Sequence, residues 1–247
     1  MKFVVKKIIT LIVTLLLISV LTFAAFSVIP GDAALAKLGT NATPEKIEEL
    51  REEMGLNDPV PVRYFKWLGG AVRGDFGHSY QYSNYTVAEL LGERMLTTVI
   101  LAVMSLILIV IIGLPLGFLC ARYAGRWLDN ILNNVGQVFM AIPGFFLGIL
   151  ITYLFGIILN VFQPGAFVFP TENFGGCIAY LVFPAIAIAI PKIAMVARFL
   201  RNSMLGEVRK DYVRTAYSKG NPENRVLMRH VFKNGMIPVI TFLGMVI

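Results

Sequence analysis

Residues 95–121 read MLTTVILAVMSLILIVIIGLPLGFLCA and contain no charged side chain. An apolar run of about 18 residues or more is long enough to cross the hydrocarbon core of a membrane as an α-helix. Three further stretches are also free of charge, namely 8–31, 130–171 and 173–191. Together the four stretches predict an all-α fold, a polytopic bundle of transmembrane helices.

The composition of the whole chain agrees with this prediction. Of its 247 residues, 57% are hydrophobic and only 15% are charged, and the mean hydropathy is +0.72. Soluble domains contain about 45 to 50% apolar and about 25% charged residues. The composition therefore argues against a soluble globular protein, and two cysteines are too few for a disulfide framework.

The charged residues set the expected boundaries along the chain. We expect an N-terminal transmembrane helix in 1–29, an external segment with amphipathic helices in 30–95, and a core in 96–247. Helices are predicted near the following positions: 8–29, 96–120, 131–159 and 178–199. A fifth apolar run begins at 235 and stops at 247, which is too short to span a membrane. We therefore expect the chain to end inside a fifth helix.

A cleaved signal peptide is the alternative interpretation of residues 1–29, because the stretch has a basic start and Ala34-Leu35-Ala36 offers small residues for cleavage. The apolar stretch 8–29 is longer than the usual signal core of about 7 to 15 residues. It is also long enough to cross the membrane, so a retained helix is the favoured interpretation.

Basic residues are distributed unevenly between the expected loops. They precede the first apolar run, follow the second in the loop at 122–129, and number nine between Arg198 and Lys233 against three acidic residues. The segment 30–95 instead holds ten acidic and seven basic residues. Because cytoplasmic loops are enriched in Lys and Arg, this bias predicts a cytoplasmic amino terminus and an external segment 30–95. In a soluble protein the net charge of +7 would raise the question of nucleic acid, but in a membrane protein the distribution of charge matters more than its sum. We therefore expect membrane lipid, and no nucleic acid, as a partner.

The external segment contains two amphipathic patterns. Thr43 can cap a helix that is followed by Gly55. Residues 62–73 suit a second helix at the membrane interface, with Tyr64 and Trp67 at the level of the headgroups. The segment is either a cap packed on the bundle or a docking surface for a soluble partner.

The cytoplasmic segment 201–233 is the most informative part of the chain. Asp211 can cap a short helix, 212–219, that ends at Gly220, and Asn221 can cap the helix that follows. On that second helix basic residues recur at i, i+4 and i+8: Arg225, Arg229 and Lys233. Contact with lipid headgroups explains this basic stripe, but it does not explain the capped helix before it.

The decapeptide DYVRTAYSKG at 211–220 resembles the cytoplasmic coupling motif of bacterial ABC-transporter permeases, in the dipeptide, oligopeptide and nickel importer group. Other stretches resemble signatures of that group in the same order: PGD at 30–32, GLNDP at 55–59, RGDFG at 73–77, GLPLG at 113–117, IPGFFLG at 142–148, and residues 198–205. The resemblance covers essentially the whole chain and is greatest to the oligopeptide permeases.

Two features differ from the family pattern. Such permeases continue through a complete fifth and a sixth span. In the general permease motif an acidic residue and an alanine stand where this chain has Arg214 and Thr215, so only Ala216 and Gly220 match the stricter form. No carboxylate at position 214 can therefore be given a role.

The resemblance implies a subunit that forms half of the translocation path of an ATP-driven importer in the bacterial plasma membrane. Its implied partners are a second, homologous permease, two cytoplasmic ATPase subunits and an external solute-binding protein. It also implies a set of residues that couple the chain to the ATPase: Asp211, Tyr212, Thr215, Ala216, Lys219 and Gly220. The chain has no Gly-x-x-x-x-Gly-Lys-Ser/Thr phosphate loop. We therefore expect no cofactor and no catalytic residue in this chain, with ATP bound by the partner subunits.

Lys192 and Pro143 are candidates for the translocation path. Lys192 precedes Arg198 by about 9 Å along a helix, so its ammonium can extend to the cytoplasmic face. Alternatively it faces the path, since ionisable groups in spans usually face a cavity or the bundle interior. Pro143 is expected to kink its span, which is compatible with gating.

Other functional classes fit the sequence less well. The chain has no His-Glu-x-x-His and no Gly-x-Ser-x-Gly motif, which argues against an intramembrane enzyme. A secondary transporter driven by an ion gradient remains the alternative of a different class, although the four spans carry no Asp, Glu or His at midplane. Two distant histidines and two distant cysteines cannot form a metal site. Peptides are therefore favoured as the solute, and nickel or another small solute is the alternative.

Overall fold

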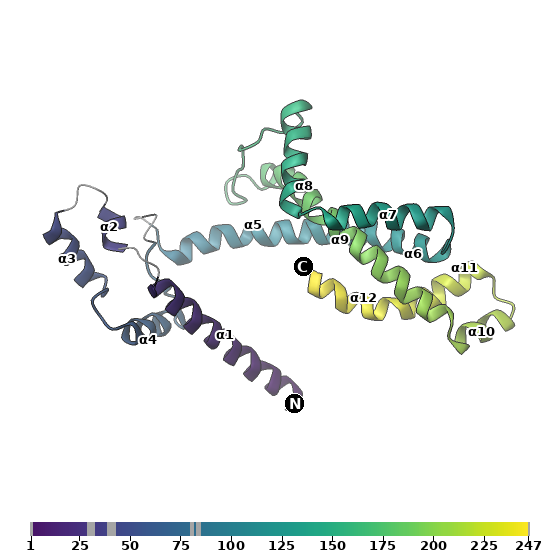
Figure 1. The fold of residues 1–247 in the computed structure, drawn as a ribbon, viewed down its shortest axis with the longest axis horizontal. Helices are drawn as coiled ribbons and strands as arrows, with labels where there is room; N and C mark the ends of the chain where they lie inside the picture. The colour runs from purple at the N-terminus through teal and green to yellow at the C-terminus, as the bar shows by residue number, and fades with distance from the viewer. Residues whose placement is uncertain (1, 29–32, 39–42, 80–81, 83–84, 247) are drawn as a thin grey trace. The chain divides into compact units, whose positions relative to one another are not determined.

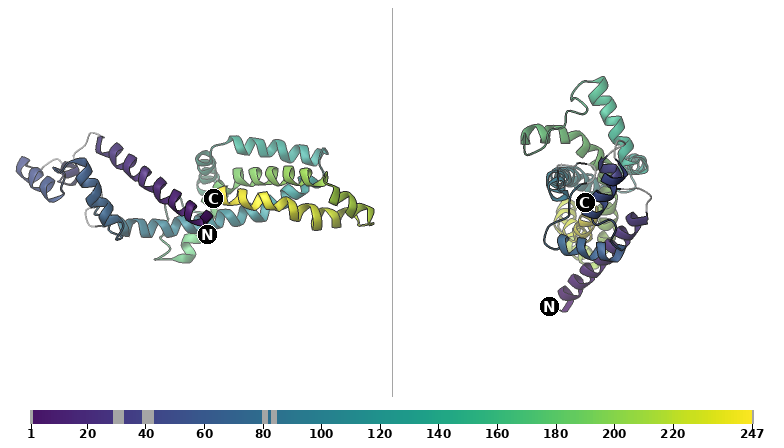
Figure 2. Two further views of the ribbon diagram at one scale, coloured as in Figure 1. Left: turned by 90° about the horizontal axis from the view of Figure 1, so that it is seen from below. Right: turned by 90° about the vertical axis from the view of Figure 1, so that its left-hand side faces the viewer.

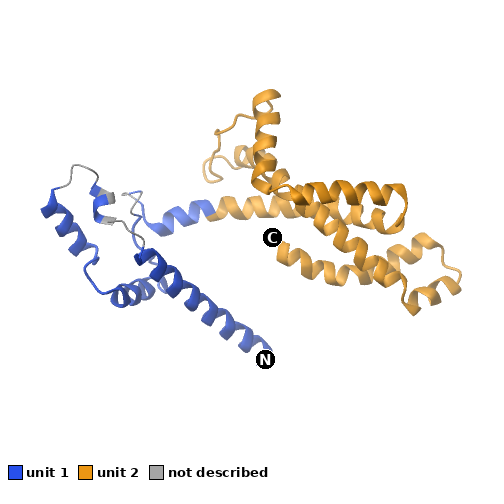
Figure 3. Ribbon diagram, in the orientation of Figure 1, with its two compact units in different colours: residues 1–94 blue, residues 95–247 orange. Residues whose placement is uncertain are grey.

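The computed structural model describes residues 2–28, 33–38, 43–79, 82 and 85–246 (Figures 1 and 2). Within these residues the chain forms helices, and its β-pairing is limited to an isolated bridge between His78 and Thr86. The prediction of an all-α membrane fold is confirmed. The chain divides into two compact units, residues 1–94 and residues 95–247 (Figure 3).

Unit 1 contains the N-terminal helix and the segment that the sequence predicts to be external. Its elements are α1 (Lys2–Val28), α2 (Ala33–Leu38), α3 (Pro44–Glu53), α4 (Val60–Ala71) and the first residues of α5 (Val87–Leu108). Thr43 precedes α3, but its side chain makes no capping hydrogen bond. Gly55, after the end of α3, has a φ of +64°, a conformation that glycine adopts without strain.

Helix α4 packs against α1 through a small cluster of polar and aromatic side chains. The hydroxyl groups of Ser19 and Tyr64 lie 2.8 Å apart and share a hydrogen bond. The ring of Phe23 lies 5.4 Å from that of Tyr64 and 6.0 Å from that of Trp67. Tyr64 is thereby buried. Part of the segment 30–95 therefore packs on the N-terminal helix.

Unit 2 is the larger helical bundle. After α5 the chain continues through a π-helical segment η1 (Ile109–Gly113) into α6 (Leu114–Arg122), and then forms α7 (Trp127–Ala141), α8 (Gly144–Ile151) and a second π-helical segment η2 (Thr152–Ile158). The long α9 (Phe174–Val208) is followed by the short α10 (Asp211–Ser218). The chain closes with α11 (Glu223–Val226), a third π-helical segment η3 (Leu227–Phe232) and α12 (Lys233–Val246).

Helix α9 is the centre of unit 2, and it packs against α6, α7, α8 and α12. Its buried side chains include Val196, Leu200 and Met204, which join Ile109 of η1 and Val239 of α12 in one apolar core. The core continues into α10 and the helix after it through buried aliphatic residues: Val213, Ala216, Val226, Leu227 and Val231. The segment 211–231 is therefore part of the packed bundle.

The prediction of one helix at 131–159, kinked at Pro143, is wrong, because the structure has two helices there. Between Ala141 and Gly144 the chain bends by 96°, so α7 and α8 are separate helices. Ile142 is extended, with φ −82° and ψ 124°, because the ring of the following proline disfavours helical backbone at the residue before it. Pro143 thus breaks the span instead of only kinking it.

Three helical stretches in the described residues are long and apolar enough to cross a membrane, and the bent pair would make a fourth. They are Lys2–Val28, Val87–Arg122 and Phe174–Val208. The last is longer than the predicted 178–199, since Arg198, Arg201 and Glu207 continue the helix instead of ending it. Helix α9 therefore extends beyond its apolar stretch and ends just before α10 begins.

Candidate functional site

Helix α10 is a short helix held between the end of α9 and a glycine turn. Lys210, with φ −79° and ψ 150°, precedes the helix, and Asp211 is its first residue. The prediction that Asp211 caps the helix is therefore wrong by one position. Asp211 instead accepts, at its backbone carbonyl, a hydrogen bond of 3.1 Å from the hydroxyl of Thr215.

The far end of α10 is closed by Gly220 and Asn221. Gly220 has a φ of +75°, and its amide donates to the carbonyl of Tyr217 at 2.9 Å. Asn221 was expected to cap the next helix, but Pro222 occupies that position. The side chain of Asn221 instead donates to the carbonyl of Ala216 at 3.0 Å. It therefore closes the turn by satisfying a carbonyl at the end of α10.

The two faces of α10 differ in exposure. Val213 and Ala216 are buried in the core of unit 2. The opposite face is exposed and carries the following residues: Asp211, Arg214, Thr215, Tyr217, Ser218 and Lys219. Of the predicted coupling residues, Ala216 therefore seats the helix on the bundle, whereas Thr215 and Lys219 are free to contact another protein.

The base of α10 is tied to α9 by hydrogen bonds on Glu207. The hydroxyl of Tyr212 donates to Oε2 of Glu207 at 2.7 Å, and the ammonium of Lys210 donates to Oε1 at 2.6 Å. Burial raises the pKa of the Tyr212 phenol, and the hydrogen bond to Glu207 raises the pKa of the Lys210 ammonium. Both groups thus keep their protons at neutral pH and donate to Glu207.

Sequence reasoning missed Glu207 as part of this site. The only signal was its spacing from Lys210, since charges at i and i+3 on a helix are neighbours. That spacing is common on exposed helices and does not by itself indicate a site. The contact with Tyr212 depends on the tight turn between α9 and α10, which the sequence pattern does not specify.

Lys192 and Pro143 lie elsewhere in unit 2 and are not brought together with α10. Lys192 is half-buried on α9, and its ammonium donates to the backbone carbonyl of Val246 on α12. Its ammonium therefore points toward α12 instead of extending along α9 toward Arg198. Pro143 lies at the bend between α7 and α8.

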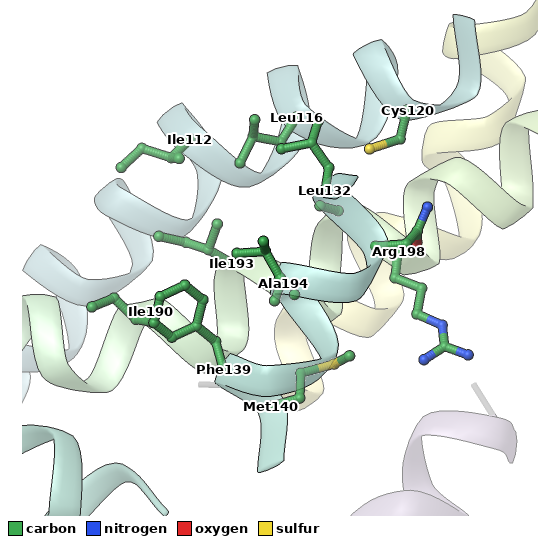
Figure 4. A pocket seen from close by; sticks show the side chains of 14 residues that line it. Ile112, Leu116, Cys120, Leu132, Phe139, Met140, Ile190, Ile193, Ala194 and Arg198 are labelled. Atoms are coloured by element: carbon green, nitrogen blue, oxygen red, sulfur yellow. The ribbon is translucent and has the colours of Figure 1, made fainter. Parts of the chain in front are cut away.

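An apolar pocket of about 290 Å³ lies between α6, α7 and α9 (Figure 4). Its wall includes Leu116, Leu132 and Ile193, with Cys120 and Arg198 toward one end. Neither Lys192 nor Pro143 lines it. Among the described residues there is also no group of three His, Cys, Asp or Glu side chains able to hold a metal ion.

Comparison with known proteins gives two family matches that together cover almost the whole chain. Residues 113–247 match the family described as "Binding-protein-dependent transport system inner membrane component". Residues 1–109 match the family described as "Binding-prot-dependent transport system membrane comp, N-term". The first match contains α10 and its neighbours α9 and α12.

Individual relatives match over nearly the same length. The chain is 34% identical over 247 residues to the oligopeptide transport system permease protein AppB of Bacillus subtilis, covering 99% of this chain and 78% of that protein. It is 30% identical over 242 residues to a probable peptide ABC transporter permease protein, y4tP, of Sinorhizobium fredii, covering 98% and 77%. A putative peptide permease protein of Brucella suis is 33% identical, covering 93% and 73%.

Proposed function

Since the chain belongs to the family of binding-protein-dependent transport system inner membrane components, we propose that it is the permease subunit of an ATP-driven importer of peptides. Its helices form half of the path through the membrane. The observation that carries this proposal is α10, a short helix that is seated on the bundle by Val213 and Ala216 and exposes its other face.

The family description and the exposed face of this helix support a set of proposed partners. An external binding protein delivers the solute, as the family description implies. A second permease of the same kind completes the path, and two cytoplasmic ATPase subunits supply the energy. ATP binds to those subunits, because this chain has no phosphate loop of its own. Energy therefore reaches the permease through contact.

The exposed face of α10 makes that contact. Thr215, Tyr217 and Lys219 lie in a cleft of the ATPase, and closure of the ATPase on ATP displaces the helix. Since Tyr212 is tied to Glu207 at the end of α9, the displacement passes to α9 and to the helices packed on it. Alternating access is then a two-state movement of packed helices, not a continuous deformation.

Peptides are the proposed solute class. The three relatives described above, from Bacillus subtilis, Sinorhizobium fredii and Brucella suis, are all named for peptide or oligopeptide transport. A nickel importer would need its metal recognised by a binding protein, since the described residues hold no metal cluster. The family and the names of the relatives therefore favour peptides over nickel.

The function is tested on the full-length permease complex purified with its binding protein. Mass spectrometry identifies the solute that the binding protein retains, and uptake of that solute is then measured in proteoliposomes. We expect a peptide, taken up only when ATP is supplied to the ATPase side. Uptake that persists without ATP on an imposed proton or sodium gradient would instead indicate a secondary transporter.

The orientation in the membrane is a further prediction. Single cysteines at Lys46 and Glu172, which are exposed, should react with a membrane-impermeant thiol reagent added outside intact cells. Cysteines at Arg126 and Glu223, which are also exposed, should react only after the membrane is opened. The reason is the excess of Lys and Arg on the cytoplasmic side. Labelling of Arg126→Cys from outside would reverse the proposed orientation.

A further inference from the structure

A buried ion pair joins α7 to α9 near their cytoplasmic ends. Asp129 lies in the first turn of α7 and is 1% exposed, whereas Arg201 lies on α9 with 21% of its side chain exposed. The Nε and Nη2 atoms of Arg201 donate to the two carboxylate oxygens of Asp129, each at 2.6 Å. The pair is therefore bidentate, the strongest arrangement available to these two side chains.

The same carboxylate also holds the turn between α6 and α7. The amide of Gly125 donates to Oδ2 of Asp129 at 2.8 Å, and the side chain of Asn133 donates to Oδ1 at 2.5 Å. Gly125 has a φ of +77°, so the turn has a defined shape that this hydrogen bond fixes. Asp129 thus connects three parts of unit 2: the turn, α7 and α9.

Stability alone does not explain an ion pair whose carboxylate is buried. The free energy needed to remove two charges from water is about as large as the free energy gained from their attraction. Replacing such a pair by apolar residues is therefore often neutral or stabilising. The geometry of Asp129 is instead suited to fixing one relative position of α7 and α9. The two hydrogen bonds from Arg201 to Asp129 form only when the two helices keep one register.

The position of Arg201 links this pair to the coupling helix. Arg201 precedes Glu207 by six residues on α9, about 9 Å along the helix axis. Glu207 in turn holds Tyr212 of α10. A continuous connection therefore runs from α10 through Glu207, along rigid α9, to Arg201 and Asp129. From Asp129 it continues along α7 to the break at Ile142 and Pro143.

We propose that Asp129 is a positioning residue of the transport cycle. It binds the α6–α7 turn to α9. When the ATPase displaces α10, α7 and the break at Pro143 therefore move as well. This inference rests on the proposed function, because the displacement is that of an ATP-driven permease. In a protein that lacks the pair, movement of α9 no longer displaces α7. ATP is then hydrolysed without movement of solute.

The test is a double-mutant cycle in the full-length complex, with Asp129→Asn, Arg201→Met and the two together. Each single variant leaves one group of the pair without its partner, so thermal stability should fall in both. The double variant has no lone charge, and its stability should recover toward that of the unmodified protein. Solute uptake should stay reduced in all three variants, roughly tenfold, because none retains the ion pair between Asp129 and Arg201.

Further measurements separate positioning from a general loss of structure. The concentration of loaded binding protein that half-saturates uptake should not change, since the variants leave the external segment 30–95 untouched. The maximal rate should fall. The amount of solute moved per ATP hydrolysed should fall with it. As a control for the loss of a carboxylate, Glu48→Gln breaks an exposed ion pair with Arg51 on α3 and should leave the maximal rate and the amount of solute moved per ATP unchanged.

Two outcomes would overturn the inference. If uptake recovers together with stability in the double variant, the pair is only structural. If Asp129→Asn transports at the unmodified rate, the ion pair is not needed to couple ATP hydrolysis to transport. Failure of the proposed function is distinguishable, because in that case the unmodified complex itself shows no ATP-dependent uptake.

Discussion

Gly220→Val should abolish transport while leaving the membrane-spanning helices assembled. Gly220 has a φ of +75°, a conformation that a β-branched residue adopts only at a cost of roughly 1 to 3 kcal/mol. A side chain at this position would meet nothing within 4 Å. The penalty therefore comes from the backbone alone, and relieving it changes the direction in which the chain leaves α10. The exposed face of α10 then no longer fits its partner.

The measurement compares solute uptake, attachment of the ATPase and solute-stimulated ATP hydrolysis in the variant and the unmodified complex. Gly220→Asn is the matched control, because asparagine tolerates positive φ better than other non-glycine residues. It adds a side chain at the same open position and should retain most of the transport. Full transport by Gly220→Val, with normal assembly, would mean that the geometry of this turn does not matter for coupling.

Gly117→Ala should destabilise the bundle itself. A Cβ atom at this position would lie 2.7 Å from the carbonyl oxygen of Ala197 and 3.0 Å from Cβ of Leu200, both on α9. The nearest atoms belong to the backbone, so no side-chain rotation can relieve the contact. Helices α6 and α9 must move apart, and overpacking of this kind costs typically about 1 to 3 kcal/mol.

Thermal unfolding of the purified complex measures this effect, and Gly148→Ala is its control. Gly148 lies on α8, where an added Cβ atom would meet nothing within 4 Å. Replacing it by alanine should leave stability unchanged or raise it slightly, since alanine favours helix more than glycine does. Equal midpoints for the two alanine variants would show that α6 and α9 are packed less closely than described.

The transmembrane character of the chain was predictable because uncharged runs of sufficient length have few alternatives to a spanning helix. The break at Pro143 was harder to predict. A proline in a span can leave the helix merely kinked when neighbouring groups satisfy the freed backbone atoms. Whether it kinks or breaks depends on packing around Ile142, which only the structure supplies.

Helix α10 was also predictable in outline, since Gly220 marks its end and an acidic residue marks its start. The burial of Ala216 was not, because a small residue fits both an exposed helix face and a packed one. Asp129 was missed for a different reason. A carboxylate three residues after Arg126, at the end of a basic loop, is typical of a solvated turn. Its partner Arg201 lies 72 residues away in the sequence.

The central claim, that α10 contacts the ATPase, is tested most directly by site-specific cross-linking in the assembled complex. A photoreactive amino acid replaces Tyr217, which is 41% exposed on α10, or in a parallel sample Trp127, which is 72% exposed at the start of α7. The account predicts a covalent product with the ATPase subunit from position 217, at higher yield than from position 127. A product from position 127 with none from position 217 would contradict the account.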